Sequence, residues 1–308
     1  MNASMASSVA GKSSGYQVVP AAGFAGPEPL AFPLFLRESP DVWVPFLDGQ
    51  GPCSQEQIDR LAEEGVEELY IREADRKVYM QRIESSLDAL LQNRAIELSR
   101  RAEVLYGVAL SVAEDLLHGT LDARGVERAQ RLFVAAGSLF LREPKAFAAL
   151  PDFPGRCQGI VEHSVRCAFL TMGLAQHTHV VDPGLLVMAG LAGLLHDIGR
   201  VGYEDVAHDP EHVERGYEIL RRLNMAPELC QAVRLHHERR DGSGYPQALR
   251  GSQIPELAQL VGMADVFDKV HSSPWPKVSV FDALSIVAHA YRGCFDRVLA
   301  ARFVRLFR

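Results

Sequence analysis

The 308-residue sequence predicts a mainly α-helical protein, in which a small α/β module and a long linker helix precede a helical C-terminal half. Two observations predict this fold class. Apolar residues recur at helical spacing from Arg76 to His118, and helical patterns with tight turns continue from Arg156 to Arg308. Short apolar runs that favour strands lie between Ala31 and Arg76. The length suits about two domains.

The composition of successive segments suggests four parts. We expect a flexible tail over residues 1–30, because this stretch is rich in Ser, Ala and Gly and lacks the basic start and apolar core of a signal peptide. The small α/β module should cover residues 31–76, helical linkers residues 77–150, and the main domain residues 151–308.

The α/β module has its own local signals. Leu34–Leu36 and Val42–Val44 favour short strands, and Glu68–Ile71 favours another. Ser54 and Gln57 have the spacing of a capping box, which predicts that a helix begins between these strands. We see no set of catalytic residues in this module.

The stretch from Arg76 to His118 predicts one long amphipathic helix. Such a helix can pack on a second copy of itself, which suggests a homodimer, or it can pack on the C-terminal domain. A second helix is expected from Asp122 to about Arg142, before the Pro- and Gly-containing stretch Leu150–Gly155.

Composition excludes several classes of function. The net charge of −7 argues against a basic nucleic-acid-binding protein. No segment reaches the roughly 18 apolar residues that a membrane span needs. The five cysteines form no CxxC pair, which disfavours a disulfide framework or a thiolate zinc site and fits a cytoplasmic protein. They are Cys53, Cys157, Cys167, Cys230 and Cys294.

Histidines and aspartates in the C-terminal half share one context, because each lies on or at the end of an apolar helical segment. These residues are His163, His196, Asp197, His212, His236, His237 and Asp265. Burying such side chains singly costs several kcal/mol, whereas together they can share a pair of cations. Nitrogen and oxygen ligands suit iron or manganese, with zinc, nickel and magnesium as alternatives.

Two divalent ions would give this cluster hydrolytic chemistry. They lower the pKa of a bound water and neutralise the oxygens of a phosphodiester. Asp197 and Arg200, three residues apart, are the candidate catalytic residues, and Arg200 is placed to contact the scissile phosphate. The sequence therefore predicts a metal-dependent phosphodiesterase.

These motifs resemble the HD-GYP domain of the HD superfamily. The matching residues are His163-Ser164, His196-Asp197-Ile198-Gly199, His212 followed by Gly216-Tyr217-Glu218, His236-His237-Glu238, Asp241-Gly242-Ser243-Gly244-Tyr245-Pro246, and Asp265 in Ala-Asp-Val-Phe-Asp. The resemblance covers about half of the chain and implies an HD-type helical bundle from Arg156 to the C-terminal end.

The resemblance also implies an activity, hydrolysis of cyclic di-GMP to pGpG or onward to GMP. One metal ion would be held by His163, His196, Asp197 and Asp265, and the other by Asp197, His212, His236 and His237. Arg200 would contact phosphate. Gly244, Tyr245 and Pro246 would shape the guanine side of the pocket and could bind partner proteins, and Arg250 and Lys277 are further candidates for substrate binding.

Departures from the family pattern keep alternatives open. Gly159 stands where some members have a glutamate for a third metal ion, so we expect two ions. The segment Ser272–Lys277 replaces the usual loop after the last aspartate. The chain could therefore be a weakly active or inactive signalling module that binds nucleotide or partner proteins, or an HD phosphohydrolase with a different nucleotide substrate.

Overall fold

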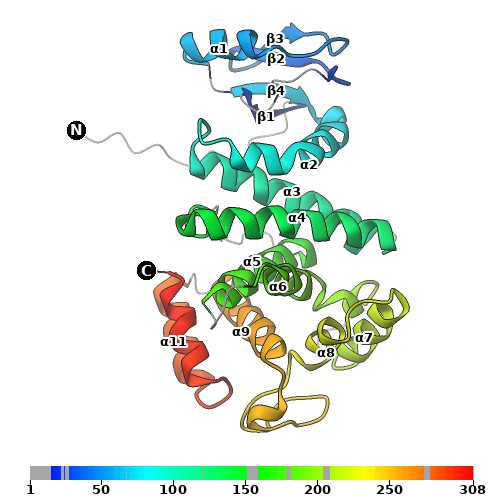
Figure 1. Cartoon of the computed structure of the whole chain (residues 1–308), viewed down its shortest axis with the longest axis vertical. Coiled ribbons are helices and arrows are strands. Elements are labelled where there is room, and N and C mark those ends of the chain that lie inside the picture. The colour runs from blue at the N-terminus through cyan, green and yellow to red at the C-terminus, as the bar shows by residue number, and fades with distance from the viewer. Residues whose placement is uncertain are drawn as a thin grey trace, which may run out of the picture. The chain divides into compact units, whose positions relative to one another are not determined.

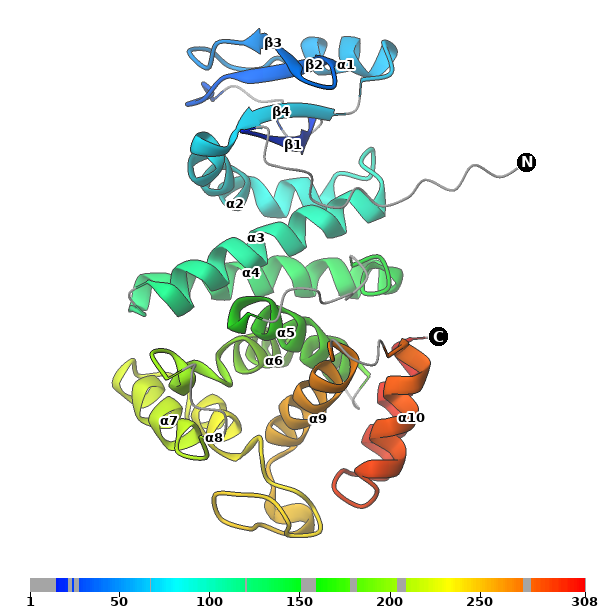
Figure 2. The same ribbon diagram turned by 180° about the vertical axis from the view of Figure 1, so that it is seen from behind.

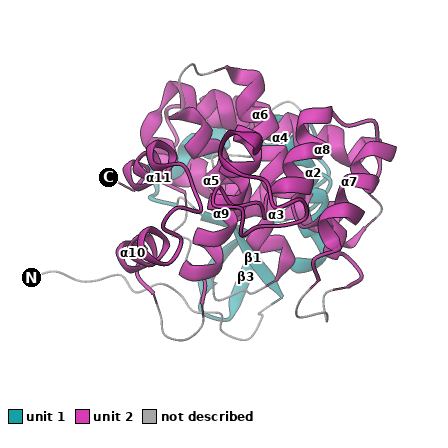
Figure 3. Ribbon diagram, turned by 90° about the horizontal axis from the view of Figure 1, so that it is seen from below, with its two compact units in different colours: residues 1–86 teal, residues 87–308 magenta. Residues whose placement is uncertain are grey.

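The computed structural model divides into two compact units, residues 1–86 and residues 87–308 (Figure 3). It describes residues 15–21, 24, 28–66, 68–119, 121–150, 159–177, 182–203, 209–273 and 278–307. Most of these residues are helical, with a small antiparallel sheet near the N-terminus, so the predicted fold class is confirmed. No helix among them is both long and apolar enough to cross a membrane.

Among its described residues, the first unit contains a four-stranded antiparallel sheet in the order β1-β4-β2-β3, a helix that follows β3 and the start of the helix that follows β4 (Figure 1). Its elements are β1 Tyr16–Pro20, β2 Leu34–Ser39, β3 Val42–Leu47, α1 Gln55–Glu63 and β4 Glu68–Arg72. The expected strands and helix are present. Ser54 and Gln57 form the predicted capping box, which satisfies backbone donors at the start of α1.

The prediction of a flexible tail over residues 1–30 was wrong for residues 16–20. These residues form β1, whose Val18 pairs with Tyr70 of β4. The ring of Tyr16 stacks on Trp43 with centroids 4.6 Å apart, and Val19 is buried. Tyr and Val favour strands, but the surrounding Ser- and Gly-rich composition hid this short run.

The prediction of one continuous helix from Arg76 to His118 was also wrong. The segment forms α2 Arg76–Gln92 and α3 Leu98–His118. At the break, the side chain of Asn93 accepts a hydrogen bond from the backbone N–H of Ala95 (3.0 Å). Asn is a common turn residue because its side chain bonds to nearby backbone in this way.

Arg101 stabilises the break from inside the second unit. Its side chain is almost fully buried and donates hydrogen bonds to the carbonyl oxygens of Leu91 (2.9 Å) and Ile96 (3.0 Å). It also pairs with Glu143 at 2.7 Å. Glu143 follows α4 Ala123–Arg142, so the ion pair ties the start of α3 to the end of α4.

Helix α4 spans nearly the predicted range from Asp122 to Arg142, is capped by Asp122, and packs with α3 and α5. Phe133 and Phe140 of α4 both make edge-to-face contacts with Phe169 of α5. The apolar face of α3 is likewise buried inside this unit, at residues that include Leu105 and Val112. This packing corresponds to the second possibility given above for the amphipathic segment, packing on the C-terminal domain. The homodimer, which was the first possibility, stays a prediction.

The remaining helices continue the second unit, in which α5 packs on α6 and both contact α9 (Figure 2). They are α5 Ile160–Gln176, α6 Pro183–Leu195, α7 His212–Arg222, α8 Pro227–Leu235, α9 Glu256–His271, α10 Val280–Ala290 and α11 Arg297–Arg305. Helix α6 is apolar on all sides and is buried between α4, α5 and α9. Its last residue is Leu195, so the polar residues His196 and Asp197 follow at a point where the chain already lies inside the apolar core.

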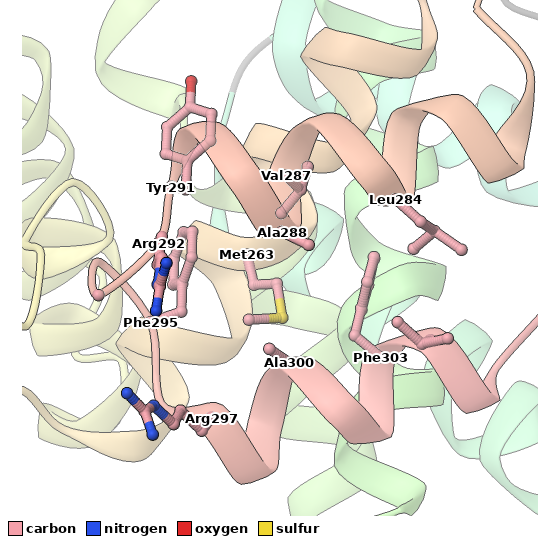
Figure 4. Close-up of a pocket in the computed structure, with 12 residues that line it drawn as sticks. Met263, Leu284, Val287, Ala288, Tyr291, Arg292, Phe295, Arg297, Ala300 and Phe303 are labelled. Carbon is pink, nitrogen blue, oxygen red and sulfur yellow. The ribbon is translucent and has the colours of Figure 1, made fainter.

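A cavity of about 450 Å³ lies between α9, α10 and α11 (Figure 4). Met263 and Phe303 line it, and Arg292 and Arg297 lie at one end. Met263 precedes Asp265 by two positions on α9. Side chains two positions apart project from nearly opposite sides of a helix, so the cavity lies behind the face of α9 that carries Asp265.

Replacing Arg101 with methionine should destabilise the second unit. The apolar stem is kept, but two carbonyl groups at the α2–α3 break lose their donor, which costs about 1–2 kcal/mol each. We expect the free energy of unfolding to fall by about 2–4 kcal/mol, as measured by urea denaturation followed by circular dichroism. Arg100→Met is the matched control, because Arg100 forms a partly exposed pair with Glu103 on the same helix. Equal losses in the two variants would contradict this role.

The effect should depend on pH. The hydrogen bond from Arg101 lowers the pKa of Glu143 below its usual value. The stability that the pair contributes is therefore fully present above the usual pKa of glutamate and is lost as the pH falls through the folded-state value. The difference in stability between wild type and Arg101→Met should shrink below about pH 4.

Candidate metal centre

The structure brings all seven predicted metal ligands together at the ends and inner faces of five helical segments. His163 lies on α5, His196 and Asp197 follow α6, His212 begins α7, His236 and His237 follow α8, and Asp265 lies within α9. Helix α7 begins at His212 itself. Each short side chain is thus carried by a rigid element.

Potential ligand atoms fall into two groups, and within each group all of them lie within 4.8 Å of one another. One group is His163, Cys167, His196 and Asp265, and the other is Asp197, His212, His236 and His237. The second group matches the ligand set that the resemblance implies for one metal ion. The first group lacks Asp197 and adds Cys167.

The carboxylate of Asp197 faces both groups. Its Oδ2 lies 3.6 Å from His196 Nε2 and 3.9 Å from His163 Nε2. Its Oδ1 lies 3.1 Å from His212 Nε2 and 3.8 Å from His236 Nε2. One oxygen therefore points toward each set of imidazoles, which is the placement that a carboxylate bridging two cations requires.

Three of the histidines are oriented by the backbone. The Nδ1 atoms of His196, His212 and His236 lie 2.8, 2.5 and 2.7 Å from the carbonyl oxygen of the residue three positions earlier. A carbonyl oxygen only accepts, so each Nδ1 carries the proton and donates it. The lone pair of each Nε2 then points into the cluster, as metal-binding histidines require.

His163 is oriented by Asp268. Its Nδ1 donates to Asp268 Oδ2 at 2.8 Å, and Arg166 holds the same carboxylate with two hydrogen bonds of 2.5 and 3.0 Å. A carboxylate behind a histidine is a common support for a metal ligand. The sequence analysis missed Asp268, although it lies three residues after Asp265 and therefore on the same side of α9.

Charge and burial set the protonation states of the cluster. Burial alone would raise the pKa of Asp197 and Asp265, but neighbouring His196 and Lys269 lower both pKa values well below the usual range. Burial, together with the neighbouring imidazole of His237, lowers the pKa of His236. Burial also lowers the pKa of His237 to about 3. At neutral pH Asp197 and Asp265 are therefore anionic and His236 and His237 are neutral, which are the forms that bind cations. Burial alone would lower the pKa of His163, but Cys167 and the hydrogen bonds to Asp265 and Asp268 raise it well above its usual value.

The residues fit a pair of divalent cations. The Nε2 atoms of His236 and His237 are buried, and neither has a hydrogen-bond partner among the described residues. A buried nitrogen without a partner costs free energy, which a cation would recover by accepting the lone pair. The thiol of Cys167 fits less well, because burial raises its pKa to about 11 and keeps it protonated at neutral pH.

Two basic side chains contact the carboxylates of the cluster. Arg200, a predicted catalytic residue, places its Nε 3.0 Å from Asp197 Oδ1. It lies on a short 3₁₀ turn, Ile198–Arg200. This turn can pack on α7 because Gly199 has no Cβ, and a Cβ there would clash with the backbone of His212. Lys269, which the sequence analysis missed, places its Nζ 2.6 Å from Asp265 Oδ1.

The Gly-Tyr-Pro segment packs directly against the cluster. The ring of Tyr245 stacks on His237 with centroids 4.7 Å apart. Gly244 has no room for a side chain, since a Cβ would clash with the backbone of His237 and Arg239. Buried Glu238 anchors the following residues by accepting hydrogen bonds from backbone N–H groups nine and eleven positions later (2.6 and 2.8 Å).

The other predicted substrate-binding residues lie further out or outside the described structure. Pro246 and Arg250 are exposed, and the Arg250 guanidinium lies against Gly242. No contact described for Arg250 reaches a candidate metal ligand. Lys277 lies outside the described residues, so its placement stays a prediction. Glu162, next to His163, belongs to neither group of potential ligands.

Comparisons with known protein sequences agree with this geometry. A family model described as HD domain matches residues 160–270, which include all seven predicted ligands. A cyclic di-GMP phosphodiesterase of Pseudomonas aeruginosa is 34% identical over 54% of this chain and 43% of its own length. A 3′3′-cGAMP-specific phosphodiesterase of Vibrio cholerae is 34% identical over 30% of this chain and 22% of its own length. A cyclic di-GMP phosphodiesterase of Thermotoga maritima is 37% identical over 36% of this chain and 34% of its own length. This chain spans less than half the length of each.

A solved structure extends the likeness to both units. The protein Bd1817 from Bdellovibrio bacteriovorus, described as an HDG"Y"P protein, has a TM-score of 0.67 and 16% sequence identity over 94% of this chain and 99% of its own. At this identity the likeness establishes the fold alone. Residues 160–270 therefore match the HD domain, and the fold that contains them is that of Bd1817.

Proposed function

We propose that this chain is a phosphodiesterase that uses two divalent metal ions to hydrolyse a cyclic dinucleotide. The observation that supports this most strongly is the carboxylate of Asp197, with one oxygen directed to each group of imidazoles. His163, His196, Asp197 and Asp265 would hold one ion, and Asp197, His212, His236 and His237 the other. Iron or manganese suits these nitrogen and oxygen donors, with zinc, nickel or magnesium as alternatives.

The bound ions would supply an activated water and neutralise charge on the phosphodiester. The chain's own residues would place the substrate. Arg200 is partly exposed beside Asp197, so its guanidinium can turn from that carboxylate to a phosphate oxygen, and a planar fork of donors suits phosphate. Tyr245 extends a flat aromatic surface from His237, on which a guanine base could stack.

Cyclic di-GMP is the first substrate to test. Three of the curated relatives, 34–37% identical over the matched residues, are named as phosphodiesterases of cyclic di-GMP, and another is named as specific for 3′3′-cGAMP. All of these substrates carry a guanine and two phosphodiester bonds. With Gly159 in place of a carboxylate, two ions rather than three would be bound, and pGpG would be the main product. The Gly-Tyr-Pro loop, which lies partly at the surface, could also bind signalling proteins.

A second candidate is a signalling module that binds nucleotide with little turnover. The contact between Lys269 and Asp265 favours it, because a cation of the chain already occupies one oxygen of a candidate metal ligand. Purified chain should be incubated with Mn²⁺ or Fe²⁺ under reducing conditions and with cyclic di-GMP or 3′3′-cGAMP, and products separated by chromatography. Turnover of neither compound with any metal, alongside measurable nucleotide affinity, would favour this second candidate.

Replacing Asp197 with asparagine should abolish most of the activity. The substitution keeps the shape of the side chain but removes the charge shared between the two groups of imidazoles. We expect kcat/KM to fall by at least about 100-fold, since metal activation of water supplies much of the rate. Asp115→Asn is the control, because Asp115 forms a partly exposed pair with Arg128 away from the cluster. Activity within about two-fold of wild type in Asp197→Asn would contradict the proposal.

Replacing Asp268 with asparagine should weaken metal binding without removing a ligand. Asp268 orients His163 and increases its basicity through the 2.8 Å hydrogen bond. Loss of such a support lowers metal affinity by about 10- to 100-fold, which competition with a chromophoric chelator would measure. Circular dichroism should show that the variant is folded, since Arg166 also loses charge compensation. An unchanged affinity in a folded variant would show that Asp268 has only a structural role.

A further inference from the structure

Lys269 occupies an unusual place for a lysine on a helix surface. Its Nζ lies 2.6 Å from Oδ1 of Asp265, four residues earlier on α9. That same oxygen lies 3.2 Å from His163 Nε2 and 3.6 Å from His196 Nε2. The ammonium group therefore lies against the carboxylate oxygen that faces the imidazoles of the first group.

This contact differs from an ordinary ion pair between neighbouring turns of a helix. Such pairs join two exposed side chains and contribute little to stability. Here the carboxylate is buried, with 1% of its side chain exposed, whereas 46% of the Lys269 side chain is exposed. The partner of Lys269 is thus a group inside the cluster, while the flexible stem of the lysine leads out to solvent.

Simultaneous contact of the Lys269 ammonium group and a metal ion with Asp265 Oδ1 is electrostatically unfavourable. Lysine offers three donors and no lone pair, so it adds positive charge and no ligand atom. A divalent ion bound to Asp265 Oδ1 would lie within a few ångströms of that charge, in a buried region where repulsion is weakly screened. Either the ion binds weakly, or the lysine must leave.

The second group is affected differently. Its shared carboxylate, Asp197, contacts Arg200 through Oδ1. Asp197 has a second oxygen, and three imidazoles complete its group, so this group depends less on a single carboxylate oxygen. Asp265 is the carboxylate that serves the first group alone, and its Oδ1, which faces the imidazoles, is the oxygen that Lys269 contacts.

We propose that Lys269 is an internal counter-ion of Asp265 that competes with the metal ion for the first group. The two groups then fill at different metal concentrations, with the group of Asp197, His212, His236 and His237 filling first. Lys269 leaves Asp265 only when the second ion binds. This inference rests on the proposed binuclear centre, and it makes occupancy of the full centre sensitive to the supply of metal.

The test is a metal titration without substrate, so that its readout does not depend on activity. Full-length chain, stripped of metal, is titrated with Mn²⁺, and free Mn²⁺ is counted by electron paramagnetic resonance. Wild type should show two binding classes. In Lys269→Gln the weaker class should tighten by at least about 10-fold, because the competing charge is gone, while the stronger class stays within about two-fold.

Two further variants assign the effect to charge. Lys269→Arg keeps the cation and should retain the weak class. The double variant Asp265→Asn with Lys269→Gln should not show the tighter binding of the weaker class, because the side chain at position 265 no longer carries a negative charge. Lys145→Gln is the control, since Lys145 is an exposed lysine of the same unit. Lys269→Met replaces Lys269→Gln if the latter does not fold, as judged by circular dichroism.

The outcomes separate this inference from the proposed function. If neither wild type nor any variant binds Mn²⁺, the binuclear centre itself is wrong. If wild type binds two ions and Lys269→Gln binds both with unchanged or lower affinity, the centre stands and the competition is overturned. If Lys269→Gln and Lys145→Gln both bind Mn²⁺ more tightly than wild type, the change reflects net charge alone, and the proposed competition is overturned as well.

Discussion

The burial of a carboxylate at the end of an apolar helix is the constraint on which the rest of this structure depends. Helix α6 is apolar, is buried from Ala189 to Leu195, and delivers Asp197 to the interior, where an isolated charge would be very unfavourable. The surrounding helices therefore have to supply compensating groups. The imidazoles lie on or directly after four helices, and Arg200 adds a positive charge. The packing of these helices therefore also determines the geometry of the cluster.

Backbone packing gives this arrangement its precision. Gly199 allows the turn after Asp197 to touch the start of α7, which sets the distance between Asp197 and His212. Gly244 and Glu238 hold the Gly-Tyr-Pro loop against the end of α8 in a similar way. The carbonyl groups that orient His196, His212 and His236 belong to the helical turns on which these residues lie or that immediately precede them. Ligand orientation is thus determined mainly by local backbone geometry.

Local signals explain which features the sequence could predict. Each of the seven candidate ligands interrupts an apolar helical pattern, and this is visible without knowledge of the fold. Asp122 and Ser54 begin helices through side-chain caps, which are also local. Asp268 and Lys269 were missed because their roles come from partners, and helical spacing on α9 alone does not distinguish a ligand from its support. The break between α2 and α3 was missed for the same reason, since Arg101 stabilises it through Glu143, forty-two positions away.

The basic residues of the cluster bear on how this domain folds. Small metal-binding domains in which the ion compensates every buried ligand are unfolded without it. Here Arg200 and Lys269 contact the two buried carboxylates, and Arg166 contacts Asp268, so each acidic group already has a partner from the chain. The large core of α4, α5, α6 and α9 adds stability that does not depend on a cation. The domain can therefore fold without a cation, and any cation that binds Asp197 or Asp265 would have to displace interactions that the folded chain has already made.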